Sequence, residues 1–141
     1  MTRRDLCFPL AESFWSEGAF KLNHMLEPGL AKKVTIHLNE DTYAARDFLY
    51  NEIFEFLFER GVAGANMVRP AAGFGSHHRV HQTDLGRDGN EHMPVRIEFI
   101  ESPEKVASLM PDLCALLSDG LIEAHDTIIY KAATRREAQS S

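Results

Sequence analysis

Two units, each a strand followed by a helix, restrict the fold of this chain more than any other feature. In the later unit Val95, Ile97 and Phe99 alternate with polar neighbours, which is the two-residue period of a strand with one buried face. This segment, 94–100, runs into Ser102-Pro103-Glu104, a capping side chain followed by a proline and an acidic residue suited to a first helical turn. We therefore expect a strand over 94–100 and a helix directly after it.

The helix of this later unit is expected to present one apolar face and to end at Asp119-Gly120. Pro111 removes one backbone donor, so we expect a kink or two short helices there. Cys114 falls on the apolar side of the pattern, which predicts a buried small hydrophobe and not a reactive thiol. The predicted apolar positions are Val106, Leu109, Met110, Leu113, Leu116 and Leu117.

The earlier unit has the same form. Lys33 to Leu38 alternates like a half-buried strand, and Asp41 or Thr42 can cap a helix over about 43–60 that Gly61 ends. The expected core stripe of this helix is Ala45, Phe48, Leu49, Ile53, Phe56 and Leu57. A second aromatic row faces elsewhere and is a candidate surface for the N-terminal segment or a subunit contact: Tyr50, Phe54 and Phe58.

Further strands are expected over about 64–69 and 125–131, which gives the order strand, helix, strand, strand, helix, strand. With right-handed crossovers, the two halves interleave into an α+β, ferredoxin-like βαββαβ sandwich, a four-stranded antiparallel sheet with both helices on one face. His37, Arg96 and Glu98 place polar groups on the other face, which suits water or a polar seam between subunits.

The composition fits one soluble globular domain with additions at both ends. Of 141 residues, 44% are hydrophobic and 26% are charged. We expect residues 1–32 to be an aromatic extension that packs on the domain or on a neighbour, 33–132 to be the domain, and 133–141 to be a flexible tail. No apolar run reaches the roughly 20 residues of a membrane span, and early acidic residues argue against a cleaved signal, so a cytoplasmic protein is expected.

Charge and cysteine content exclude further classes. The net charge of -6 argues against a nucleic-acid partner, because neutralising phosphates needs a surplus of clustered basic residues. An anionic ligand would need a local basic pocket. Cys7 and Cys114 are the only cysteines and lack metal-site spacing, so both are expected to be free thiols.

The stretch 71–92 is rich in glycine and histidine, has no regular period and is long for a loop inside a compact domain, which is typical of functional loops. Its densest part combines glycines, which let backbone amides approach a ligand, with Arg79 and histidines that can supply positive charge to a phosphate or carboxylate. Composition alone favours the plainer alternative, a turn that leaves a strand.

Several spaced blocks resemble one known family. Gly61-Val62-Ala63-Gly64-Ala65, Met67-Val68-Arg69 and Gly73-Phe74-Gly75, with His81 beyond them, are similar to the PII-like proteins of the domain of unknown function 190 family. The proline-bearing second helix and Asp119-Gly120-Leu121-Ile122 fit the same pattern, so the resemblance covers about residues 33–131. It implies a ferredoxin-like subunit that forms a homotrimer with its sheets facing inward and is related to PII signalling proteins.

In PII proteins, adenine nucleotides lie in clefts between subunits, at the base of a long mobile loop and at a glycine-containing turn before the last strand. The resemblance thus implies a regulatory protein, not an enzyme, without a permanent cofactor, whose effector is an adenine nucleotide or another small anion. The loop would control a partner, by resemblance a membrane transporter. Leu121 stands where PII has a lysine for the phosphates, so triphosphate binding would need a substitute. The residues expected to bind the ligand, from the resemblance and from the composition of the loop together, are Arg69, Gly73, Phe74, Gly75, Ser76, His77, Arg79, His81, Asp119 and Gly120.

Two alternatives stay open. Imidazoles close together in a loop can converge on zinc or copper, which would make the protein a metal-binding trimer through His77, His78, His81 and His92. Against this, adjacent histidines in a strand-like backbone point apart, and metal sites usually show a mixed ligand set. A small enzyme could use Glu98 or His37 as acid or base, but no nucleophile, base and orienting group stand in a known spacing.

Overall fold

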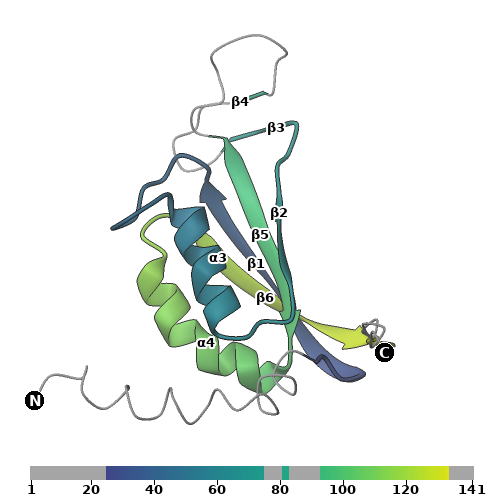
Figure 1. The fold of residues 1–141 in the computed structure, drawn as a ribbon. Coiled ribbons are helices and arrows are strands. Elements are labelled where there is room, and N and C mark those ends of the chain that lie inside the picture. The colour runs from purple at the N-terminus through teal and green to yellow at the C-terminus, as the bar shows by residue number, and fades with distance from the viewer. Residues whose placement is uncertain (1–24, 75–80, 83–92, 134–141) are drawn as a thin grey trace, which may run out of the picture.

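The computed structural model describes residues 25–74, 81–82 and 93–133, the pair 81–82 by its backbone alone. Figure 1 shows a twisted sheet with two helices packed on one face. The elements in chain order are β1 (Gly29–Asn39), α3 (Leu49–Glu59), β2 (Ala65–Val68), β3 (Ala72–Gly73), β4 (His81–Gln82), β5 (Pro94–Glu101), α4 (Pro103–Leu116) and β6 (Leu121–Ile129).

The main sheet has four strands in the order β2-β5-β1-β6, and every neighbouring pair is antiparallel. The two strand-helix units therefore interleave, with β1 and β5 at the centre, and the ferredoxin-like prediction is confirmed. Register places four residues in one row across the sheet: Val68, Arg96, His37 and Leu121. The trimer stays a prediction.

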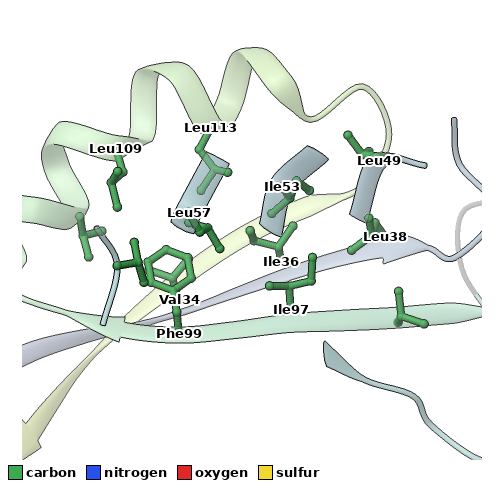
Figure 2. Packing of buried hydrophobic residues seen from close by; sticks show 13 residues of the cluster. Val34, Ile36, Leu38, Leu49, Ile53, Leu57, Ile97, Phe99, Leu109 and Leu113 are labelled. Atoms are coloured by element: carbon green, nitrogen blue, oxygen red, sulfur yellow. The ribbon is translucent and has the colours of Figure 1, made fainter. Parts of the chain in front are cut away.

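The core lies between the helices and the sheet (Figure 2). β1 buries Val34, Ile36 and Leu38, which confirms the alternation predicted for this strand. The remaining members of the core cluster come from β5, from both helices and from the turn after α3: Val95, Ile97, Phe99, Leu49, Ile53, Leu57, Val62, Val106, Leu109 and Leu113. Each element thus buries one face in the core, and polar groups lie on the opposite face of the sheet.

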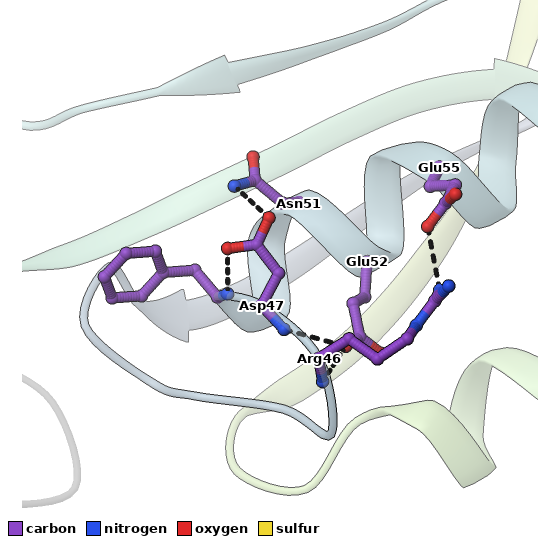
Figure 3. Close-up of polar contacts among 6 residues, drawn as sticks. Arg46, Asp47, Asn51, Glu52 and Glu55 are labelled. Atoms are coloured by element: carbon purple, nitrogen blue, oxygen red, sulfur yellow. Dashed lines mark hydrogen bonds and ion pairs between the residues drawn. The ribbon is translucent and has the colours of Figure 1, made fainter.

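Helix α3 begins at Leu49, and the expected start near residue 43 is wrong. Phe48 is the N-cap residue, so neither Asp41 nor Thr42 caps the helix. The carboxylate of Glu52 accepts hydrogen bonds from two backbone amides before the helix, those of Arg46 at 2.7 Å and Asp47 at 3.1 Å (Figure 3). This contact holds the preceding residues in a turn outside the helix.

The rest of α3 follows the sequence more closely. Tyr50 and Phe54 pack partly buried against the core, so only Phe58, which is 77% exposed, remains of the expected second aromatic row. Ala45, assigned to the core stripe, is exposed because it lies in the turn before the helix. Gly61 ends the helix as predicted: its φ is 68°, and its amide donates to the carbonyl of Phe58 at 3.0 Å.

Helix α4 begins as predicted, with the hydroxyl of Ser102 accepting a hydrogen bond from the amide of Lys105 at 3.2 Å. It continues through Pro111 as one helix, so the expected alternative of two short helices is wrong, and it ends at Leu116 and not at Asp119-Gly120. Pro111 and Ala107 are both exposed, and water can solvate the carbonyl that the proline leaves without a partner. Cys114 is exposed, contrary to expectation, because it stands a full helical step of about 100° beyond the buried Leu113.

β1 begins earlier than expected, and β6, expected over about 125–131, runs over Leu121–Ile129. β1 starts at Gly29, so residues 29–31 pair with 127–129 of β6 beyond the end of β5. Figure 1 shows this two-stranded ribbon projecting from the sheet near the C-terminus. The expected domain start at residue 33 thus falls inside a strand. The stretch 71–92 also differs from expectation, since β3 and β4 pair within it.

Candidate ligand-binding site

Most of the described residues that were predicted to bind a ligand gather at one end of the sheet, here called the loop end and defined by Glu40, Arg69, Gly73, Pro94 and Gly120. Asn39 pairs with Pro94 and His37 pairs with Leu121, so the chain segments next to these pairs leave the sheet at the same end. β2 and β6 are the two edges of the sheet. Arg69 therefore lies at one edge and Gly120 at the other.

Arg69 is held by a carboxylate of its own chain. Its Nε and Nη2 donate to the same oxygen of Glu40, at 2.8 and 2.6 Å. The hydrogen bond to Glu40 raises the pKa of the Arg69 guanidinium, which keeps it charged. Glu40 is fixed in turn, because its amide donates to the carbonyl of Met93 at 2.8 Å. An incoming anion would have to share Arg69 with Glu40 or displace it.

Gly73 occupies a place where a larger residue does not fit. A Cβ at this position would lie 2.8 Å from Cγ of Pro94, closer than real Cβ contacts come. Gly73 pairs with His81, so the two sides of the loop base are joined next to the first residue of β5. Phe74, the next residue, is 63% exposed. The loop base thus places an exposed aromatic ring beside a close-packed glycine.

Position 120 has less room for a side chain than position 73, and its backbone conformation also favours glycine. Its φ is 135°, a conformation that L side chains rarely adopt, and a Cβ would lie 2.2 Å from the carbonyl oxygen of His37. The turn before β6 therefore rests directly on the backbone of β1. Asp119 is half-buried in this turn, and Leu121 after it is 56% exposed.

Residues 31–129 match the sequence profile of the domain of unknown function 190 family, DUF190, described as uncharacterized ACR. The chain belongs to this family. The DUF190 match covers all four strands of the main sheet except the first two residues of β1, both helices and the loop end. Residues 1–30 precede it.

The DUF190 chain is also similar in fold to solved structures of CPII, a nitrogen regulatory PII-like protein from Thiomonas intermedia. In one, CPII is bound to ADP, AMP and bicarbonate; the match has a TM-score of 0.56 and 20% identity and covers 74% of this chain and 92% of CPII. In another, CPII is bound to ADP and bicarbonate, with a TM-score of 0.53, 20% identity and coverage of 74% and 93%. These likenesses confirm the predicted PII-like fold.

Several predicted residues lie outside the described part of the chain: Gly75, Ser76, His77 and Arg79. The histidines of the metal alternative lie there too, except that the backbone of His81 is described in β4. Among residues 25–74 and 93–133, no group of three or more histidine, cysteine or acidic side chains is placed to hold a metal ion. Whether the loop histidines bind metal therefore stays untested.

The open face of the sheet carries the polar groups that the sequence predicted. Glu98 pairs with Lys33 at 3.3 Å and with Arg96 at 3.5 Å, and His37 contacts Glu123 at 3.3 Å. Two cations thus hold the carboxylate that the enzyme alternative would use, which is the arrangement of an ion-pair network.

In the described ranges, no helix is long and apolar enough to cross a membrane.

Sequence reasoning missed two acidic residues that shape this region, Glu40 and Glu123. Both partners are distant along the chain, Arg69 for Glu40 and His37 for Glu123. Glu40 had one usable signal, since it stands two residues after the predicted strand 33–38 and therefore had to lie near the end where that strand stops. The partner of Glu123 depends on strand register, which the sequence pattern left open.

Proposed function

We propose that this protein is a cytoplasmic PII-like regulator that forms a homotrimer and binds a small anionic effector, an adenine nucleotide, in clefts between its subunits. The observation that carries the proposal is that Arg69, directly after the edge strand β2, and the Gly120 turn, directly before the edge strand β6, lie at the same end of the sheet but at opposite edges. Three strand spacings of roughly 4.8 Å separate the edges, about 14 Å in all. Neighbouring subunits could bring the β2 edge of one chain beside the β6 edge of the next.

The chemistry of the loop end favours a nucleotide with few phosphates. Arg69 offers a fixed cation, Phe74 an exposed ring on which a base could stack, and the Gly120 turn a backbone that a ligand can approach closely. Leu121 adds no charge at the position where PII proteins have a lysine. CPII, whose fold is similar, is described with ADP, AMP and bicarbonate bound, and we extend such ligands to this chain as part of the proposal.

The regulatory output would come from the segment 75–92, which begins directly after Phe74 and returns at Met93. Effector binding at its base would change how this segment meets a partner protein, for which a membrane transporter is our candidate. No permanent cofactor and no catalytic step are needed for this role. The ion-paired state of Glu98 supports a regulator over an enzyme.

Isothermal titration calorimetry with AMP, ADP, ATP and a cyclic nucleotide tests the effector. We expect AMP or ADP to bind with one site per subunit, and Arg69→Ala to weaken binding at least about tenfold, the loss of about 1.4 kcal/mol expected for a charged hydrogen bond. Arg60→Ala is the matched control, since Arg60 is an exposed arginine paired with Asp112 at 2.6 Å, at the opposite end of the sheet beside Glu101 and Ile129. Absence of binding for all four nucleotides at millimolar concentration would contradict the proposal.

The Glu40 contact gives a second, opposite test. Glu40→Gln removes the internal carboxylate that competes for Arg69, so the same nucleotide should bind more tightly, by roughly threefold to tenfold. Unchanged affinity would mean that Arg69 does not meet the ligand. The trimer is tested separately by light scattering, where a monomer at micromolar concentration would refute it.

A further inference from the structure

A hollow of ≈ 700 Å³ lies at the end of the sheet opposite the loop end. We call it the far-end hollow; its walls include Met25, Leu26, Leu30, Arg60, Lys105 and Ile129. The start of β1 and the end of β6 border it, which places it away from Arg69 and Gly120. Because an apolar cavity of about 150 Å³ accommodates one benzene ring, this volume is enough for several aromatic side chains.

The cations in its wall already have partners. Arg60 pairs with Asp112 at 2.6 Å and lies 4.9 Å above the ring of Phe56. Lys105 lies 3.7 Å from Glu101 and also donates to the carbonyl of Gly61. The wall also contains three carboxylates, those of Glu27, Glu101 and Glu104, which would repel a nucleotide or phosphate.

The apolar part of the wall is left in water. Met25 is 56% exposed and Leu30 is 75% exposed, and Leu30 belongs to the two-stranded ribbon, where it pairs with the exposed Ile128. A ribbon of two strands is marginal in water without something packed on it. An apolar or aromatic occupant of the far-end hollow would cover Leu30 and stabilise the ribbon.

We propose that the segment Phe14–Phe20 of the same chain packs into the far-end hollow. The described chain begins at Met25, which lines this hollow, and 24 residues precede it. Phe20 stands five residues before Met25, so even a fully extended chain keeps it within about 18 Å of the hollow. Phe14 and Trp15 add two large rings, each of which buries roughly 150–250 Å² when packed.

Two other positions for the segment are less well supported. Leu26 also borders a second hollow of ≈ 440 Å³ on the open face, but Met25 does not line that hollow, so the chain arrives from the side of the far-end hollow. The aromatic row on α3 is largely used by the core, and its exposed member, Phe58, does not line the far-end hollow. The same chain is favoured over a second copy because Met25 and Leu26 already lie in place.

Trp15 is the only tryptophan, so its fluorescence reports directly on the segment. In the full-length protein we expect emission at shorter wavelength, and acrylamide quenching severalfold weaker, than in the same protein unfolded in guanidinium. Ser108→Arg, in the wall of the hollow, should shift the emission and the quenching toward the unfolded values. Ala115→Arg is the control, since Ala115 is exposed on the same helix outside the hollow. Quenching equal to that of the unfolded chain, or no response to Ser108→Arg, would overturn the proposal.

Disulfide trapping separates the same chain from a second copy. In a variant carrying Cys7→Ser and Cys114→Ser, the pair Ala19→Cys and Ser108→Cys should oxidise to an intrachain disulfide, because the proposal brings residue 19 to the wall that contains Ser108 and bridged cysteines need Cα atoms about 4.4–6.8 Å apart. Ala19→Cys with Ala115→Cys is the control pair and should stay reduced. A covalent dimer would assign the hollow to a neighbouring chain, and no disulfide would remove the segment from it; either result would refute the proposal.

Discussion

Replacing Gly120 by alanine should destabilise the protein more than the same change at three other glycines of the described chain. Two costs add at this position. Alanine at a φ of 135° is strained, which costs roughly 1–3 kcal/mol, and its Cβ would lie 2.2 Å from the backbone carbonyl of His37, which cannot move as a side chain can. Forced overpacking costs about 1–3 kcal/mol more. We therefore expect a loss of about 2–6 kcal/mol, a large share of the 5–15 kcal/mol that typically stabilises a domain.

The three other glycines separate the two costs. Gly29 has a φ of 127° but no atom within 4 Å of the place that a methyl group would take, so Gly29→Ala measures backbone strain alone. Gly73→Ala measures crowding without positive φ, against the side chain of Pro94, which can shift. Gly64 has neither cost, and Gly64→Ala should be neutral or slightly stabilising, by up to about 1 kcal/mol.

Urea unfolding followed by circular dichroism gives the free energy of unfolding for each variant. The expected order of destabilisation is Gly120 first, Gly29 and Gly73 next, and Gly64 last. If Gly120→Ala costs no more than Gly29→Ala, then the contact with the carbonyl of His37 does not constrain the turn and the reasoning fails. A Gly120→Ala protein too unstable to purify would still be compared by thermal melting in cell lysate, where it should melt lowest of the four.

The remaining predictions concern individual side chains. Ser102→Ala removes the N-cap of α4 and should lower the free energy of unfolding by about 0.5–2 kcal/mol in urea titrations, whereas an unchanged midpoint would mean that the cap contributes nothing. The hydrogen bond from Lys32 at 2.6 Å lowers the pKa of the Asp126 carboxyl, so this pair stabilises the fold above the ordinary pKa of an aspartate and the contribution disappears as pH falls through the lowered value. Lys32→Met should return the pKa of Asp126 toward its ordinary range in a nuclear magnetic resonance titration, and the difference should shrink in high salt. Cys114 should react with a thiol reagent in the native protein, in a variant that lacks the other cysteine, at a rate that does not depend on unfolding; protection until denaturation would show that the side chain is covered.

The elements that sequence analysis predicted well are those in which one pattern dominates. In β5 burial alternates strictly, and in β1 the apolar residues Val34, Ile36 and Leu38 keep the same two-residue period, although Thr35 between them is also buried. At Ser102 the capping serine and the following proline act together. The start of α3 could not be predicted this way, because the apolar period continues before Leu49 while Glu52 holds the amides of Arg46 and Asp47 in a turn. The hydrophobic spacing would allow a helix over these residues, but their local hydrogen bonds stabilise a turn.

Several residues of the candidate site could be named from the sequence, but the contacts that constrain them could not. Gly73 and Gly120 were singled out through a family resemblance, whereas the contacts that favour glycine at these positions, with Pro94 and with the carbonyl of His37, join distant segments. The contact between Arg69 and Glu40 likewise depends on two strands ending at the same place. Cys114 shows the reverse case, where the apolar face of the helix was predicted correctly but was extended by one residue too many, so that an exposed thiol was assigned to the core.

The way Gly120 rests on β1 has a consequence for how relatives of this chain could diverge. The position of the turn is set by a glycine against a main-chain carbonyl, and the side chain of His37 takes no part in that contact, since it reaches instead to Glu123. Asp119 and Leu121 can therefore change without moving the turn. Mutation at these two positions would alter the charge and shape offered to a ligand while the scaffold stays in place, so ligand preference can drift in this family at little cost in stability.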